Sequence, residues 1–169
     1  IILDAGSDPK VDGLGATPHL ATVPEGTVDA IIITHAHQDH IGSLPVLTRS
    51  QPQCPVFMTE GTANIADTML HNSVNVMTRQ REELKLMEYP LYTHRGVDLC
   101  QQAWVRCPLR QRRDLAGNLS DDDNEVTFEF YHAGHILGSV GVLIRHAGKS
   151  FFYTGDVNFE SQTIMTGAD

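Results

Sequence analysis

The stretch Thr-His-Ala-His-Gln-Asp-His, residues 34–40, directly follows the apolar run Ala-Ile-Ile-Ile at residues 30–33. A run that is apolar at every position is typical of a strand buried on both faces, and we predict such a strand over residues 28–34. Three imidazoles and one carboxylate therefore stand where this strand ends and the chain turns. The combination favours a layered α/β or α+β fold with a functional site at the rim of a sheet.

The spacing of these side chains predicts a metal site. His35 and His37 are separated by one residue, so both point the same way from an extended segment and can hold one ion. Asp39 and His40 follow at the turn and can face a second ion, and two ions about 3.5–4 Å apart form a typical hydrolytic pair. Imidazole nitrogen and carboxylate oxygen are ligands that Zn²⁺ accepts. The alternative is a histidine-rich exposed turn, which the buried strand before it disfavours.

Four ligands do not complete two metal sites, so other segments must contribute. His135 lies in Ala-Gly-His-Ile-Leu-Gly-Ser, residues 133–139, whose small residues let the backbone approach closely. Asp156 ends Thr-Gly-Asp at residues 154–156, and its carboxylate could bridge two cations. Each motif alone is weak, because a histidine in a loop is usually a surface residue and Gly-Asp is usually a turn. We predict that Asp156 and Asp39 have catalytic roles beside the metal ions.

Periodicity and length predict one domain with interleaved strands and helices. A chain of 169 residues can bury a substantial core. The sequence predicts strands at 1–3, 28–34, 56–59 and 126–131, a hairpin of 139–145 with 150–153, helices at 44–47, 62–86 and 93–105, and irregular connections at 11–25 and 114–125.

Composition limits the surface and the compartment. The net charge of −9 argues against a broad basic surface for nucleic acid, although bound metal ions can reverse the sign in a cleft. Three cysteines without CxxC spacing predict small buried residues in a reducing, cytoplasmic environment. No apolar run is long enough for a transmembrane helix, and the first residues do not form a signal peptide.

The only basic cluster lies at residues 106–113 and admits two interpretations. Arg112 and Arg113, with Arg106 and Arg110, could contact phosphates along a substrate path. The alternative is a solvated face balanced by the acidic residues 121–123.

Taken in order, the motifs at residues 34–40, 133–139 and 154–156 resemble the metallo-β-lactamase superfamily. The longer words Tyr-His-Ala-Gly-His-Ile-Leu-Gly-Ser (131–139), Phe-Tyr-Thr-Gly-Asp (152–156) and Pro-Leu-Tyr-Thr (90–93) resemble its β-CASP branch, which includes the cleavage and polyadenylation specificity factor nuclease and ribonuclease J. The resemblance implies an αββα sandwich. Residues 1–169 would form the N-terminal part of the lactamase domain, with the β-CASP domain and the C-terminal lactamase half absent.

The resemblance also implies roles for the residues. The positions carried over are His35, His37 and His135 for the first ion, Asp39 and His40 for the second, and Asp156 as the bridge. Asp4 would orient the histidine loop by hydrogen bonding, the alternative being a plain carboxylate at a strand end. The implied cofactors are two divalent ions, zinc first, with manganese or iron as alternatives. Because the branch supplies its last second-site ligand and its general acid from segments beyond this chain, we expect one ion to bind well, the second poorly, and turnover to be low.

The implied activity is hydrolysis of RNA phosphodiester bonds by a hydroxide that two metal ions activate. RNA would then be the partner, with a protein complex or a homo-oligomer as further expectations. Two alternatives stay open. The same centre could hydrolyse a thioester or a lactam, or the chain could be a truncated, non-catalytic scaffold domain.

Overall fold

Two four-stranded sheets and four α-helices make up the computed structural model, which describes all residues 1–169. The parallel sheet has the order β1 (Ile2–Leu3), β2 (Ile31–Ile32), β3 (Val56–Met58) and β4 (Trp104–Arg106). The antiparallel sheet has the order β5 (Arg113–Asp114), β6 (Thr127–His132), β7 (Val140–His146) and β8 (Lys149–Tyr153). The helices are α1 (Gln38–Ile41), α2 (Leu44–Ser50), α3 (Glu60–Glu83) and α4 (His94–Gln101), and short 3-10 helices cover Gly13–Ala16 and Leu20–Thr22.

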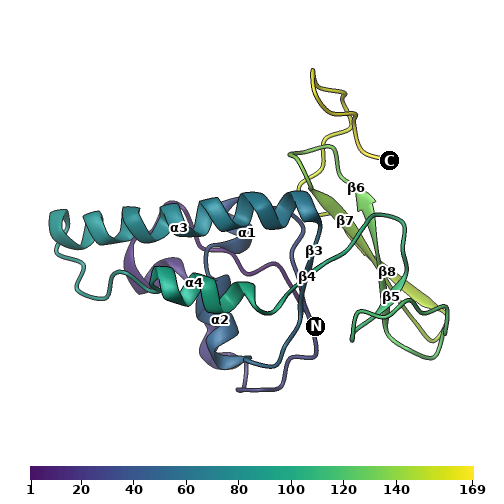
Figure 1. Cartoon of the computed structure of the whole chain (residues 1–169), viewed down its shortest axis with the longest axis horizontal. Helices are drawn as coiled ribbons and strands as arrows, with labels where there is room; N and C mark the ends of the chain where they lie inside the picture. Colours follow the sequence, from purple (N-terminus) through teal and green to yellow (C-terminus); the bar gives the residue numbers. More distant parts are fainter.

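The elements form three layers (Figure 1). The helices lie on one side of the parallel sheet, the antiparallel sheet lies on the other, and no helix covers the outer face of the antiparallel sheet. The predicted α/β class is confirmed, and the layers correspond to the αββ part of the expected αββα sandwich.

The central strand β2 is buried on both faces, as its uninterrupted apolar run predicts. Ile31 and Ile33 belong to the core between the parallel sheet and the helices. Ile32 belongs to a smaller core between the two sheets, where Phe57 packs against Phe128 with ring centroids 4.7 Å apart. The strand itself is shorter than the predicted 28–34, because the amide of Thr34 turns to the side chain of Asp4 instead of continuing the ladder.

Capping fixes the starts of the two long helices. The side chain of Thr59 accepts a hydrogen bond from the amide of Thr62 at the start of α3, and Thr93 caps α4 in the same way. α3 begins and ends slightly earlier than the predicted 62–86. The predicted helix at 93–105 is wrong at its end: α4 stops at Gln101, because Trp104–Arg106 pairs with β3 and extends the sheet.

The predicted hairpin is confirmed as β7 and β8. β7 is also joined to the parallel sheet, because the amide of Val140 donates to the carbonyl of Thr34 at 3.0 Å. This bond ties the start of β7 to the end of the segment that continues β2. The two sheets therefore meet at the edge where the predicted histidine cluster begins. The predicted irregular segment 11–25 contains the two 3-10 helices.

Candidate metal centre

The ends of four strands deliver the predicted site residues to one place. Asp4 follows β1, and the segment from His35 to His40 follows β2 and enters α1. From the other sheet, His135 lies in the loop between β6 and β7, and Asp156 follows β8. The site therefore spans the junction between the parallel and antiparallel sheets.

Four of these side chains converge on one point. Nδ1 of His37 lies 3.0 Å from Nε2 of His35 and 3.1 Å from Nε2 of His135. Oδ2 of Asp156 lies 3.5 Å from Nε2 of His135 and 3.9 Å from Nε2 of His35. All four ligand atoms lie within 4.8 Å of one another. Nitrogen atoms bound tetrahedrally to zinc at 2.0–2.1 Å are about 3.3 Å apart, so this donor set fits a single tetrahedral ion.

The other carboxylate oxygen of Asp156 faces a second group. Its Oδ1 lies 3.5 Å from Nε2 of His40, and Oδ2 of Asp39 lies 4.0 Å from the same nitrogen. Asp156 thus stands between the two groups with one oxygen directed to each. The second group offers three donor residues where the first offers four, so it is the less complete of the two.

Asp4 is the hydrogen-bonding centre beneath the histidines. Its carboxylate contacts Nδ1 of His40 at 2.7 Å and accepts from the amide of Thr34 at 2.8 Å and from the hydroxyl of Tyr153 at 3.1 Å. The contact to Nδ1 leaves Nε2 of His40 directed at Asp156. The hydroxyl of Thr34 lies within hydrogen-bonding distance of both Asp4 and Nδ1 of His35. Sequence reasoning did not identify Thr34 or Tyr153, although both flank motif residues.

Burial and neighbouring charge set the protonation of the ring and hydroxyl groups. Burial, together with the nearby His40 and His37, lowers the pKa of His35 to about 4, so this imidazole is neutral near pH 7. Burial lowers the pKa of His40, but its hydrogen bond to Asp4 and the surrounding carboxylates raise that pKa overall. Burial and Asp4 raise the pKa of Tyr153 to about 12, so its hydroxyl remains a donor.

The loop that carries His135 is held from two sides. Within the loop, Oγ of Ser139 accepts from the amides of His135 and Ile136 at 3.1 and 3.2 Å. From outside, the hydroxyls of Thr59 and Thr62 donate to the carbonyl of Gly138 at 2.7 and 2.9 Å. The start of α3 therefore fixes the position of the loop. No pattern in the sequence pointed to these two threonines.

Arg112 and Arg113 of the predicted basic cluster lie away from the metal centre. Arg112 donates to the hydroxyl of Thr127, at the start of β6, and pairs with Asp123 at 2.8 Å. The metal cluster lies beyond the other end of β6, roughly 17 Å away along a six-residue strand. Arg113 donates to the carbonyl of Gly117 and to Gln111. This placement favours the alternative of a face balanced by acidic residues over direct substrate contact beside the metals.

Comparison with known proteins agrees with this geometry. The model of the metallo-beta-lactamase superfamily matches residues 1–168. The chain is 31% identical over 169 residues to an endoribonuclease ysh-1 of Neurospora crassa, covering 99% of this chain and 19% of that protein. It is 28% identical over 170 residues to the cleavage and polyadenylation specificity factor 73 of Drosophila melanogaster, covering 100% of this chain and 23% of that protein. The chain thus spans about a fifth of the length of these curated relatives. None of its helices is both long and apolar enough to cross a membrane.

Proposed function

Because the chain belongs to the metallo-β-lactamase superfamily, we propose that it builds the metal-binding part of a hydrolase that cleaves RNA phosphodiester bonds. The proposed ligands are the residues described above: His35, His37 and His135 for one ion, Asp39 and His40 for the other, and Asp156 for both. The observation that carries the proposal is the position of Asp156, whose two oxygens face the two histidine groups separately. The endoribonuclease names of the relatives support RNA as the substrate.

The chemistry follows from this donor set. Two divalent ions, zinc foremost, would supply an activated water and offset negative charge on a phosphate oxygen. Asp39 is the most exposed carboxylate of the group, with 54% of its side chain accessible, so it can orient the attacking water or accept its proton. Asp4 holds the ring of His40 with Nε2 directed inward. A cavity of about 610 Å³ beside Asp39 and His40 leaves room for substrate.

The proposal includes the extent of the domain. Residues 1–169 would be the N-terminal part of a metallo-β-lactamase domain. Exposed aromatic side chains support this division: Phe152 lies on the uncovered face of the antiparallel sheet, and Phe159 lies after the sheet. Because the second metal group offers fewer donors, the chain alone would bind one ion tightly and the second weakly.

A calorimetric zinc titration of the metal-free chain tests the centre. We expect one tight site, and we expect Asp156→Asn to weaken it, because the amide removes the negative charge between the two groups. Asp121→Asn, in the exposed connection before β6, is the matched control and should leave the titration unchanged. Equal tight binding of two ions would contradict the expectation that the second group is incomplete, and an Asp156→Asn titration like that of the parent would contradict the ligand assignment.

Substrate class is tested separately. Zinc- or manganese-loaded chain is incubated with a fluorescent single-stranded RNA, a thioester and a chromogenic lactam, each with Asp156→Asn as the background. RNA cleavage above that background, even if slow, supports the nuclease proposal. Hydrolysis of the thioester or the lactam but not of RNA would assign the fold to another substrate, and metal binding with no hydrolysis of any of them would favour a scaffold.

A further inference from the structure

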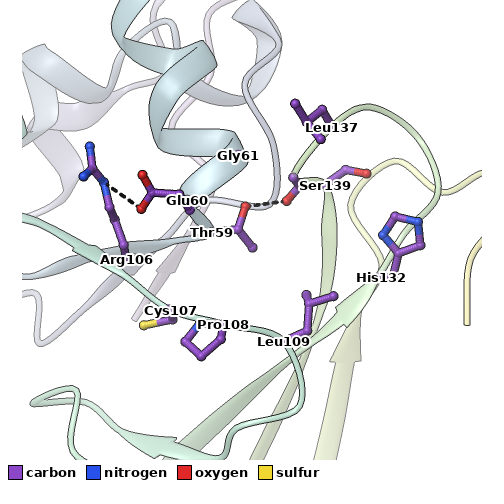
Figure 2. A pocket seen from close by; sticks show the side chains of 11 residues that line it. Thr59, Glu60, Gly61, Arg106, Cys107, Pro108, Leu109, His132, Leu137 and Ser139 are labelled. Carbon is purple, nitrogen blue, oxygen red and sulfur yellow. Dashed lines mark hydrogen bonds and ion pairs between the residues drawn. The ribbon is translucent and has the colours of Figure 1, made fainter. Parts of the chain in front are cut away.

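A second cavity lies beside the loop that carries His135. Its volume is about 480 Å³, which is in the range of small-molecule sites. In Figure 2, Arg106 and Glu60 stand on one side of it, Leu137 and His132 on the opposite side, and Pro108 with Leu109 along a third. None of these six residues belongs to the metal centre.

The cavity and the metal centre share one edge of the parallel sheet. β1 and β2 end at Asp4 and at the histidine segment, whereas β3 and β4 end at Thr59 and Arg106, which line the cavity. Because all four strands are parallel, their carboxyl ends lie along the same rim, which is where α/β proteins bind ligands. A substrate that reached the metal centre would therefore extend naturally along this rim.

The loop between β6 and β7 links the two sites directly. His135 faces the metal cluster, whereas Leu137, Gly138 and Ser139 line the cavity. His135 and Leu137 are two steps apart along the chain, so their Cα atoms are at most roughly 7 Å apart. The two sites therefore adjoin the same short loop.

The walls match a planar ring with polar edges. Pro108, Leu109 and Leu137 provide apolar surface on which a ring face can lie. At the rim, Nε of Arg106 lies 3.4 Å from Oε2 of Glu60 in an exposed ion pair, which places one donor and one acceptor side by side. An aliphatic occupant would use the apolar walls but not this pair, whereas a nucleobase can use both.

We propose that this cavity binds the base of an RNA nucleotide that flanks the phosphate held at the metal centre. The inference rests on the proposed function, since the position of the base is defined relative to a phosphate bound by the metal ions. The ring lies between Leu137 and Leu109, its edge meets Arg106 and Glu60, and the His135 loop separates the base from the metal ions. The cavity thereby sets how the scissile bond is presented.

Calorimetry with small phosphate esters tests this without any cleavage step. Zinc-loaded chain is titrated with ribose 5-phosphate, with adenosine 5′-monophosphate, with adenosine 3′-monophosphate and with hexyl phosphate. We expect the tighter-binding nucleotide to exceed ribose 5-phosphate roughly tenfold in affinity, as burial of about 55 Å² of apolar ring surface would provide. Leu109→Ser with Leu137→Ser should abolish that ratio while ribose 5-phosphate still binds. Both leucines are exposed, 39% and 63%, so the fold should tolerate the change.

The matched control is Leu119→Ser, a leucine of similar exposure, 68%, in the connection between β5 and β6. It should keep the full ratio. If neither nucleotide binds more tightly than ribose 5-phosphate, the base assignment is wrong although the metal centre stands. If hexyl phosphate binds as tightly as the nucleotides and loses affinity with them in the leucine variant, the cavity takes an aliphatic chain and the assignment is again overturned. If no phosphate ester binds the zinc-loaded chain, the proposed function fails and the base site fails with it.

Discussion

Replacing Gly138 with alanine adds one methyl group where the His135 loop contacts α3. The change should lower either the stability of the fold or the affinity for zinc. The φ of +84° at Gly138 lies in the left-handed region, which side chains other than glycine avoid. A Cβ built there would lie 2.7 Å from the carbonyl carbon of Gly61 and 2.8 Å from Oγ1 of Thr59, and closer still to the amide of Thr62. The methyl group of Gly138→Ala would thus point into the start of α3, where the His135 loop is anchored.

The expected cost has two parts. The left-handed conformation costs an alanine about 1 kcal/mol. Inserting a methyl group into a packed contact costs typically about 1–3 kcal/mol more. If the loop keeps its place, the free energy of unfolding should fall by about 3 kcal/mol in all. If the loop moves away to relieve the contact, the two threonine hydrogen bonds are lost and His135 leaves the cluster, so the cost appears as weaker zinc binding.

Gly148→Ala is the matched control. Gly148 lies in the turn between β7 and β8 with a φ of +72°, and nothing lies within 4 Å of the position that a Cβ would take there. Gly148→Ala therefore carries the cost of the left-handed backbone conformation without a steric clash. Urea unfolding in the presence of a chelator measures stability, and a zinc titration measures the site. If the free energies of unfolding of the two variants agree within about 0.5 kcal/mol and their zinc affinities are equal, the contact between Gly138 and α3 has no role in stability or metal binding.

Chelating the metal should lower the unfolding temperature, because the ion binds the folded chain. When the zinc concentration is a hundred times its dissociation constant, the ion stabilises the folded chain by about 2.7 kcal/mol. An unchanged melting curve on chelation would count against a metal site. Asp4→Asn retains a residue type that tolerates the φ of +60° at this position. It weakens the contact to His40, so zinc affinity should fall roughly 10- to 100-fold in calorimetry, and an unchanged affinity would exclude an orienting role. In the metal-free folded chain, the pKa of His35 is lowered from 6.5 to about 4. Between these two pH values the imidazole is protonated in the unfolded state but neutral in the folded state. This residue's contribution to stability should therefore fall as the pH drops through that window, by up to about 3 kcal/mol, and His35→Asn should lack that part of the urea-measured pH dependence.

The sequence predicted the parts of the fold that one segment determines. The unbroken apolar run before Thr34 has no polar face to expose, so it had to be a central strand, and the structure buries it between the helices and the second sheet. The helices predicted to begin near Thr62 and Thr93 are present as α3 and α4, which Thr59 and Thr93 cap. The end of α4 was missed because residues 102–106 suit a helix in isolation, and only the free edge of β3 makes a strand the better partner.

The same distinction between local and long-range determinants applies to the residues of the candidate site. His35, His37 and His40 were visible because they lie within six residues, and local chain geometry brings them together. His135 and Asp156 lie far along the chain, and the motif resemblance, not periodicity, assigned them to the same place. The contacts of Thr62 and Tyr153 carry no local signal at all, because they depend on how the sheets dock. For Arg112 the sequence left two interpretations open, because proximity to basic neighbours says nothing about which end of β6 this side chain contacts.

The division of the ligands between two sheets has a physical consequence. His35, His37 and His40 belong to the parallel sheet and its helix, whereas His135 and Asp156 come from the antiparallel sheet. The first ion would take His35 and His37 from one sheet and His135 and Asp156 from the other, so neither sheet alone offers the four donors of that site. The site therefore exists only when the sheets are docked. If these residues bind the ion as proposed, the packing of the aromatic core between the sheets and the binding of the ion would stabilise each other. The bond from Val140 to Thr34 and the hydroxyl of Tyr153 on Asp4 lie at this joint, so both would help to hold the proposed ligands in place.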